Sequence, residues 1–483
     1  MNDLILYKKF TKMLLKKDHK SNFPLLDIFS LLNKEKLYNP NEIREFWKEY
    51  LLESKKRGID NKISFYIHIP FCRSKCEYCH YFYWQYNNEE ELDYYLKSLI
   101  LKMNFFKDTF SGIKFKTLYF GGGTPSILNE RQLKTLFTAL YKNFKFEEKG
   151  EKTFECNPIS TTFKKLKILE QFGINRISFG VQSTNEKILK SMNRGYQTFD
   201  LVKRVINNAK KCKFKRINID LMIGLYGESA RGVVKSFRQV ITALKPDSIF
   251  VYPLLIPEEE YLEKFYKNYK TKKECLNHLD QELQRQIKEF FVLIKPVALK
   301  YDYFYFPPNS KEFNLFAEEW NFVSKEYREK DIINPFLYKY DDTEKIDCFG
   351  LGMNSCSYIF DSLNYKDIGK DFYPAGVLNP NKKIYQGLKF DNLKEQKLYY
   401  ILTESELNRL SLFAYKKLFG SDLLKDFQRP INKLKKLNKL KIKRDLIFLT
   451  SKSPLQRFVD SIFFFDKSSI IKKITSLTKD EKK

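Results

Sequence analysis

Three cysteines lie close together near the start of the chain, Cys72, Cys76 and Cys79, in the spacing C-x3-C-x2-C. An apolar run that ends at Pro70 precedes them, which predicts a loop at the carboxyl end of a buried strand. Structural zinc sites are usually closed by four protein ligands, and a [4Fe-4S] cluster normally takes four cysteines. A cubane cluster held by three cysteines leaves one iron open to an exogenous molecule. A structural zinc loop, or three unrelated buried cysteines, is the alternative interpretation.

The segment YIHIPFC at residues 66–72, together with this spacing, resembles the radical S-adenosylmethionine (SAM) enzymes. Within them it resembles the branch that contains oxygen-independent coproporphyrinogen III oxidase and a related haem chaperone. The resemblance implies that Cys72, Cys76 and Cys79 hold a [4Fe-4S] cluster and that SAM binds the fourth iron. Tyr66 and Tyr78 match residues that contact SAM in the oxidase, although aromatic residues near a cluster also exclude water.

A second motif, GGGTPS at residues 121–126, follows a predicted strand. Glycines there let the backbone approach a ligand closely and leave N–H groups free to bind it. On its own, a glycine-rich turn is equally compatible with a tight turn or a phosphate loop. The resemblance implies that Gly122, Gly123 and Thr124 bind SAM, as the matching segment contacts its methionine amino group.

Three further motifs also follow predicted strands. Glu155 opens ECNP at residues 155–158, where a carboxylate can accept hydrogen bonds from a ribose hydroxyl or an ammonium group. An isolated glutamate in such a turn is ordinarily a surface or capping residue. The other two motifs are RISFGVQ at residues 176–182, which is followed by MNRG at 192–195, and NIDLMIGL at 218–225. The resemblance implies that Glu155 and Asp220 bind SAM, and that Gln182 and Arg194 bind SAM or a second SAM. Cys156 is interpreted as a packing residue, and no catalytic residue is assigned.

The sequence departs from the oxidase at several places. The oxidase usually has a fourth cysteine two residues after the third, whereas Cys79 is followed by His80 and Tyr81. The motif DLMIGLYGES at residues 220–229, which begins with Asp220, has Tyr226 where the oxidase usually has a proline. The Gly-x-Gly-x-x-His loop of the branch reads GLGMNSC at residues 350–356, without the histidine, and the oxidase's N-terminal closing segment is absent. These differences leave the substrate open.

Between residues 62 and 255, six apolar strand-like runs alternate with helical patterns. Such β-α units are typical of a parallel sheet with helices outside, closed or partly closed as a barrel. In such barrels the site lies at the carboxyl ends of the strands. The predicted strands are 63–69, 115–120, 153–156, 176–179, 216–221 and 248–252. The predicted helices are 89–107, 129–143, 161–172, 198–211 and 229–244.

The fold class is therefore α/β, and the resemblance implies a partial (β/α)6 radical SAM barrel with an N-terminal helical extension and a small, mainly helical C-terminal domain. Apolar spacings over 23–32 and 43–52 predict helices in the extension, and 276–294 and 301–306 predict a long helix and a strand. The expected parts are 1–61, the N-terminal helical extension; 62–300, the radical SAM core barrel; 301–390, a barrel-completing region with the Gly-x-Gly loop; and 391–483, a basic helical C-terminal domain.

The 483 residues carry a formal net charge of +28, which raises the alternative of nucleic-acid binding. The lysines are spread along the whole chain, however, and the densest run, 433–443, is interpreted as a solvated face, with an anionic membrane surface or nucleic acid as the alternative. No apolar run approaches the roughly 20 residues of a membrane helix, and no signal peptide is evident. We therefore expect a cytoplasmic monomer without a transmembrane segment or a nucleic-acid partner.

The expected activity is that of a radical SAM oxidoreductase, in which the cluster and SAM yield a 5′-deoxyadenosyl radical that acts on a tetrapyrrole-type substrate, as in the oxidase. The resemblance also implies a flavodoxin or ferredoxin-type reductant. Two alternatives stay open: a haem chaperone that binds and delivers haem, and a radical C-methyltransferase of the same branch that uses two SAM molecules.

Overall fold

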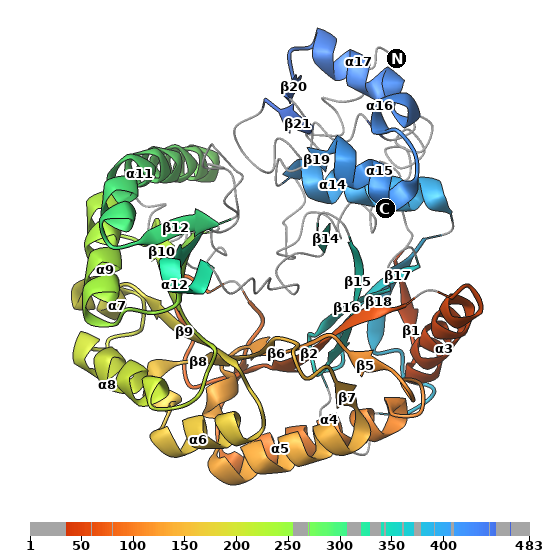
Figure 1. Cartoon of the computed structure of the whole chain (residues 1–483), viewed down its shortest axis with the longest axis horizontal. Coiled ribbons are helices and arrows are strands. Elements are labelled where there is room, and N and C mark those ends of the chain that lie inside the picture. Colours follow the sequence, from red (N-terminus) through yellow and green to blue (C-terminus); the bar gives the residue numbers. More distant parts are fainter. Residues whose placement is uncertain are drawn as a thin grey trace.

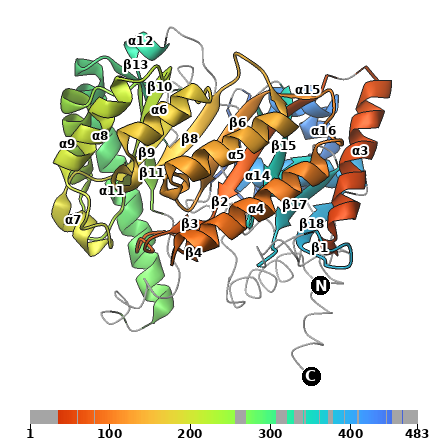
Figure 2. The same cartoon turned by 90° about the horizontal axis from the view of Figure 1, so that it is seen from below.

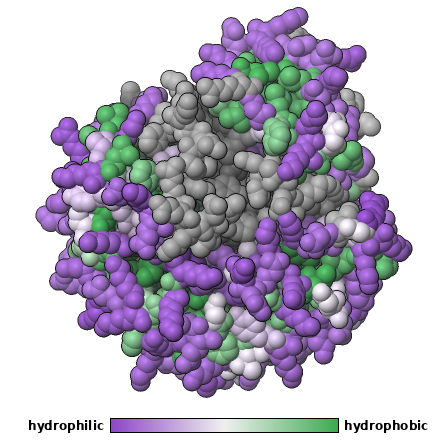
Figure 3. Space-filling view, viewed as in Figure 1, coloured by the Kyte–Doolittle hydropathy of each residue, from purple (hydrophilic) through white to green (hydrophobic). Residues whose placement is uncertain are grey.

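The computed structural model contains a large curved sheet with helices on its convex side, and a C-terminal unit with its own core (Figures 1 and 2). Hydrophilic side chains cover most of the coloured rim of the face in Figure 3. The structure describes residues 35–450 and 464, with the exception of 59, 80, 255–268, 270, 307–319, 329–339, 342–343, 360–361, 371–377, 391, 407–409 and 444.

The centre of the sheet is parallel, with neighbouring strands in the order β15-β2-β6-β8-β9-β10-β11. All six predicted strands are confirmed within one to three residues, because each is an apolar or alternating run ended by a polar or glycine-rich turn. The parallel strands are β2 (Lys62–Ile69), β6 (Thr117–Gly122), β8 (Lys152–Cys156), β9 (Arg176–Gln182), β10 (Arg216–Ile223), β11 (Ser248–Pro253) and β15 (Glu344–Leu351).

Helices connect these strands, and the five predicted ones are confirmed. Each begins after an Asn, Thr or Ser whose side chain accepts a hydrogen bond from the backbone N–H three residues later, which satisfies one free donor of the first turn. A short helix, α7 (Glu186–Ser191), was not predicted. The five are α4 (Glu89–Phe106), α5 (Glu130–Asn143), α6 (Phe163–Gln171), α8 (Phe199–Lys210) and α9 (Ala230–Ala243).

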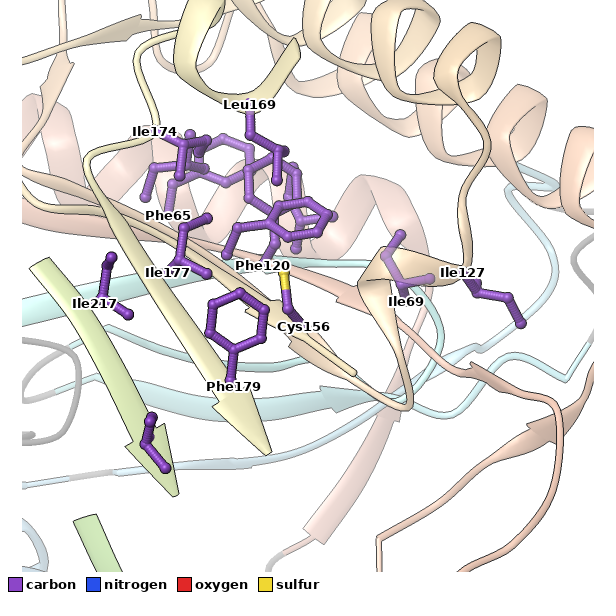
Figure 4. Close-up of a cluster of buried hydrophobic side chains, with 14 of the residues drawn as sticks. Phe65, Ile69, Phe120, Ile127, Cys156, Leu169, Ile174, Ile177, Phe179 and Ile217 are labelled. Atoms are coloured by element: carbon purple, nitrogen blue, oxygen red, sulfur yellow. The ribbon is translucent and has the colours of Figure 1, made fainter. Parts of the chain in front are cut away.

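Side chains alternate across this sheet. The outward face is apolar and packs under the helices; Figure 4 shows Phe65, Phe120 and Phe179 in this layer. Cys156 is buried with them, which agrees with its interpretation as a packing residue. The inward face instead carries polar residues such as Thr117 and Asn218. The concave side of the sheet is therefore suited to bind polar ligands.

Antiparallel strands extend the sheet beyond both ends of the parallel part. On one side lie β16 (Cys356–Ile359), β17 (Leu363–Asp367), β18 (Tyr385–Lys389) and β1 (Glu35–Tyr38); on the other lie β13 (Trp320–Ser324) and β12 (Tyr303–Phe306). Among the described strands, the terminal strands β1 and β12 do not pair with each other. The sheet is therefore a partial barrel, open between these two strands (Figure 1).

The N-terminal segment is less helical than expected. The predicted helix over 43–52 is confirmed by α3 (Pro40–Lys56), but residues 35–38 form a strand that closes one edge of the sheet. This pairing joins segments some 350 positions apart, which local sequence patterns do not reveal. The predicted helix over 23–32 lies outside the described residues.

The C-terminal unit combines short helices with a three-stranded sheet in the order β19-β21-β20. Most of the lysines of the basic run, in α17 and β20, are exposed, whereas Leu434 and Leu440 are buried. The unit is α14 (Leu393–Glu406), β19 (Leu410–Ser411), α15 (Leu412–Phe419), α16 (Leu423–Asp426), α17 (Gln428–Lys436), β20 (Leu440–Lys443) and β21 (Leu446–Leu449). The long helix and the following strand are confirmed by α11 (Lys272–Lys300) and β12. The proposed division into parts stays a prediction.

Candidate functional site

The predicted site residues gather at one edge of the sheet. Parallel strands place their carboxyl ends side by side, so loops that are distant in sequence meet there. The cysteine loop follows β2, the glycine loop ends β6, Glu155 lies near the end of β8, Gln182 ends β9, and Asp220 lies in the last half of β10. The structure thus brings the five motifs together.

The cysteine loop is held by backbone pairing. Pro70 and Cys72 accept hydrogen bonds of 2.8 Å from the backbone N–H groups of Trp84 and Tyr86, as β3 (Phe71–Cys72) pairs with β4 (Trp84–Gln85). All three thiols are partly buried. Burial raises the pKa of Cys79 to about 12 and also raises the pKa of Cys72. The thiols of Cys72 and Cys79 therefore stay protonated unless a metal stabilises the thiolates.

The glycine loop packs directly against the cysteine loop. The hydroxyl of Thr124 lies 3.3 Å from the sulfur of Cys72. Gly122 has a φ of 114°, and a Cβ there would lie 2.7 Å from Nε2 of His68; a Cβ on Gly123 would lie 2.6 Å from the carbonyl oxygen of Pro70. Glycine is therefore required at both positions, and the two loops form one rigid unit.

Arg194 joins the cysteine loop to the end of β9. One of its terminal nitrogens lies 3.7 Å from the sulfur of Cys76 and donates to the hydroxyl of Tyr78 over 3.1 Å. The other donates to the carbonyl oxygen of Gly180 over 2.6 Å and to Gln197 over 2.7 Å. The guanidinium is buried, so its positive charge acts at short range on the cysteine sulfurs.

The end of β9 is irregular where Arg194 contacts it. Gly180 pairs with Asp220, but the next pair joins Gln182 to Leu221, so Val181 is an extra residue in the strand. Gln197 donates to the carbonyl oxygen of Val181 over 2.7 Å, and Gln182 has a φ of 70°. A bulge often redirects a side chain next to a functional site. Here it sets the position of Gln182.

Glu155 faces the concave side of the sheet. Its carboxylate accepts a 2.6 Å hydrogen bond from the hydroxyl of Tyr119. Burial raises the pKa of Glu155 to about 7, although the Tyr119 hydrogen bond opposes this shift. On β2, which is separated from β8 by β6, the hydroxyl of Tyr66 and Nδ1 of His68 share a 2.7 Å hydrogen bond. Nε2 of His68 is buried without a hydrogen-bond partner in the described part of the chain.

Asp220 is held in a polar network. It accepts hydrogen bonds from the hydroxyl of Ser178 over 3.0 Å and from the amide of Asn218 over 2.7 Å. Burial raises the pKa of Asp220 to about 6, while the guanidinium of Arg176 opposes the shift. The carboxyl group therefore has a fixed orientation and is mostly ionised only above about pH 6.

Beneath these residues lies a buried ion cluster. The carboxylate of Glu151 is 4.0 Å from Nε of Arg176 and 3.9 Å from a terminal nitrogen of Arg216, and all three side chains are almost fully buried. Both guanidinium groups lie within 6 Å of the ring of Phe250. The sequence analysis did not predict this cluster, nor the roles of His68 and Tyr119. The only sequence signal is a charged or polar residue on the inward face of each strand.

The residues present suit an iron–sulfur cluster. Among the described residues, no three His, Cys, Asp or Glu side chains converge as a single metal ion requires. In a cubane cluster each cysteine binds a different iron, so Cys72, Cys76 and Cys79 need not converge on one point. The neighbouring Thr124 hydroxyl and Arg194 guanidinium are donors that can bond to thiolate sulfurs. Outer hydrogen bonds of this kind tune the potential of such clusters.

Comparison with known proteins identifies the domain. Residues 66–240 match the model of the radical SAM superfamily. This segment is a radical SAM domain. It spans β2 to α9 and contains all the predicted SAM contacts, from Tyr66 to Asp220. Radical SAM domains bind a [4Fe-4S] cluster and SAM, and these are the cofactors of this chain.

The relatives of the radical SAM domain carry two different names. The chain is 36% identical over 198 residues to the heme chaperone HemW of Lactococcus lactis, covering 40% of this chain and 50% of the relative. It is 30% identical over 208 residues to the oxygen-independent coproporphyrinogen III oxidase of Escherichia coli, covering 43% of this chain and 45% of the relative. The matches thus span about half the length of these curated relatives.

One solved structure resembles the whole fold. Coproporphyrinogen III oxidase (HemN) from Escherichia coli superposes with a TM-score of 0.65, covering 84% of this chain and 90% of that chain at 21% identity. This match confirms the fold class, a partial barrel of the α/β type. Among the described helices, none is both long and apolar enough to span a membrane.

Proposed function

We propose that the chain is an enzyme that cleaves SAM and acts on a tetrapyrrole-type substrate, as the oxidase among its relatives does by name. The observation that carries the proposal is the arrangement of Cys72, Cys76 and Cys79 beside Thr124 and Arg194 at the carboxyl edge of the sheet. When bound, the cluster and SAM supply a 5′-deoxyadenosyl radical by one-electron cleavage of a sulfur–carbon bond.

The residues of the chain have separate tasks in this proposal. The backbone of Gly122 and Gly123 and the hydroxyl of Thr124 bind the amino group of SAM, and Arg194 binds its carboxylate as a charge-assisted partner. Glu155 accepts hydrogen bonds from the ribose. Gln182, Asp220, Tyr66 and Tyr78 complete the pocket, and the aromatic rings exclude water from it.

Three expectations accompany the proposal. An external one-electron donor of the flavodoxin or ferredoxin type is required, because the described residues include no second cysteine cluster from which an internal electron relay could be built. A reducing, cytoplasmic compartment would keep the thiols of the cysteine loop available for iron. A monomeric state stays a prediction.

A haem chaperone is the second candidate, and a specific observation favours it: a relative named heme chaperone gives the highest of the reported identities, 36%. The chaperone would use the same cofactor site but release its tetrapyrrole unchanged. A methyltransferase that uses two SAM molecules is the third candidate, and in it Gln182 and Arg194 would contact the second SAM.

The test is anaerobic. The reconstituted protein is reduced with dithionite and given SAM, with and without haem or coproporphyrinogen III, and 5′-deoxyadenosine is quantified. We expect 5′-deoxyadenosine to rise with a tetrapyrrole that is consumed, and Cys76→Ala to abolish the signal. Tight haem binding with an unaltered haem would support the chaperone, and a methylated product the methyltransferase. A wild-type protein that never holds a cluster would overturn all three.

A further inference from the structure

Beyond the SAM-binding part, the inward face of the antiparallel extension carries a row of polar side chains. The strand register places Gly350 opposite Tyr66, and Cys348 opposite Tyr358, so Cys356 continues the row beyond Gly350. Lys366 lies opposite Cys356, and Gln386 lies opposite Lys366. Directly opposed residues point to the same face of a sheet. Cys356, Lys366 and Gln386 therefore face the same concave side as Tyr66, at the same edge.

Exposure confirms this alternation. Cys356 is exposed and Lys366 is partly exposed, whereas their neighbours Ser357, Tyr365 and Asp367 are buried on the opposite face. The row of Cys356, Lys366 and Gln386 thus lines the open, concave side.

The outward neighbours of Lys366 have polar partners, whereas none is found for Lys366 among the described residues. Asp367 forms a buried ion pair with Lys102, and the hydroxyl of Tyr365 accepts a 2.8 Å hydrogen bond from the indole of Trp47. In the part of the chain that the structure describes, no hydrogen-bond or ion-pair partner is found for the ammonium of Lys366. The positive charge of Lys366 acts on the candidate site: together with burial, which is the larger cause, it lowers the pKa of His68.

We propose that Lys366 binds a carboxylate side chain of the tetrapyrrole substrate. This inference rests on the proposed function and adds the residue that recognises the substrate's anionic groups. An ammonium offers three donors and a compact charge, which suit a single carboxylate. Gln386, on the adjacent strand, can add an amide donor.

The distance between Lys366 and Tyr66 sets a minimum size for the ligand. Lys366 on β17 is three strand spacings from Tyr66 on β2, or about 14 Å at the usual spacing between strands. A ligand that contacts Lys366 and also reaches the SAM-binding edge must therefore be broad and carry its carboxylates at the periphery. A macrocycle with propionate side chains has this form.

The test compares two porphyrins. Coproporphyrin III, which carries four carboxylates, and its uncharged tetraamide are titrated into the reconstituted protein, and quenching of protein fluorescence gives each Kd. We expect Lys366→Gln to weaken coproporphyrin binding about tenfold, which corresponds to about 1.4 kcal/mol, and to leave tetraamide binding unchanged. Lys366→Arg, which keeps the charge, should restore most of the affinity.

Lys145→Gln is the matched control, because it removes the same charge from an exposed strand residue, on β7 (Lys145–Phe146), which precedes β8 and lies toward the opposite edge. It should leave both Kd values unchanged. An equal loss in both lysine variants, an equal loss for both porphyrins, or no binding of coproporphyrin by the wild type would overturn the proposal. SAM cleavage measured without porphyrin reports on the proposed function separately, so the two can fail independently.

Discussion

The guanidinium of Arg194 lies 3.7 Å from the sulfur of Cys76 and at the same time donates to the carbonyl oxygen of Gly180 over 2.6 Å. One buried side chain thus connects a candidate iron ligand to the bulge that positions Gln182. Arg194 therefore links the cluster side of the site to its SAM side.

Arg194→Lys should keep the positive charge but lose the simultaneous contacts, because an ammonium cannot reproduce the planar fork of a guanidinium. We expect a SAM Kd at least about tenfold higher, the loss of roughly one charge-assisted hydrogen bond, with the iron content largely kept. Equilibrium dialysis of labelled SAM and iron analysis measure the two effects. Unchanged SAM affinity would refute the role of Arg194 in SAM binding.

Substituting any one of Cys72, Cys76 or Cys79 by alanine should prevent the protein from retaining a [4Fe-4S] cluster, because each thiolate binds a different iron. The iron and sulfide contents after anaerobic reconstitution measure the loss. Cys356→Ala is the control: this thiol is exposed and lies on strand β16, outside the cysteine loop. Equal iron loss in the control would show that the three-cysteine assignment is wrong.

Gly122→Ala should be more damaging than Gly173→Ala, although both glycines have positive φ values, 114° and 77°. A Cβ at residue 173 meets no atom within 4 Å, whereas at residue 122 it would lie 2.7 Å from the ring of His68. We expect Gly173→Ala to cost about 1 kcal/mol of stability and Gly122→Ala to cost more and to abolish SAM binding. Urea unfolding and SAM dialysis give the comparison, and equal effects would contradict it.

The affinity for SAM should depend on pH through Glu155. Since burial raises its pKa to about 7, the carboxyl group is mostly protonated at pH 6 and mostly ionised at pH 8. The ionised form accepts hydrogen bonds more strongly, so the Kd of SAM should fall by about fivefold over this range, or about 1 kcal/mol. Glu155→Gln should flatten the profile. If the variant keeps the wild-type pH dependence, another group is responsible.

Glu151→Gln should destabilise the protein strongly, because it removes the carboxylate that lies within about 4 Å of the buried guanidinium groups of both Arg176 and Arg216. The expected loss in the free energy of unfolding is about 3–5 kcal/mol. Glu53→Gln breaks an exposed ion pair with Arg57 and should have no measurable effect. Urea unfolding of both variants distinguishes a structural ion cluster from an incidental one.

The linear motifs predicted the centre of this molecule well. Cys72, Glu155 and Asp220 are each tied to the end of a strand, and strands with apolar outward faces are visible in local sequence. Their convergence then follows from parallel packing. The lysine and arginine residues on the inward face were not predicted, because a charged residue in a basic chain carries no signal of burial.

Other features depend on contacts between distant segments. The pairing of β1 with β18 joins segments that lie far apart in the sequence, and no local pattern in residues 35–38 distinguishes such a strand from the end of a helix. The bulge at Val181 likewise has no signal in the sequence, and the predicted strand ended at residue 179, before the bulge. Arg194 was assigned to SAM from the motif, but its contact with Gly180 required the structure.

The terminal strands of the described sheet, β1 and β12, each pair with one neighbour but not with each other, and this affects how the sheet can deform. A closed barrel has a fixed circumference, because widening it breaks interstrand hydrogen bonds. Here the two terminal strands can separate or approach without breaking a ladder. The curvature of the sheet can therefore adjust to ligands of different width, while the cysteine and glycine loops, which lie near its middle, keep their mutual spacing.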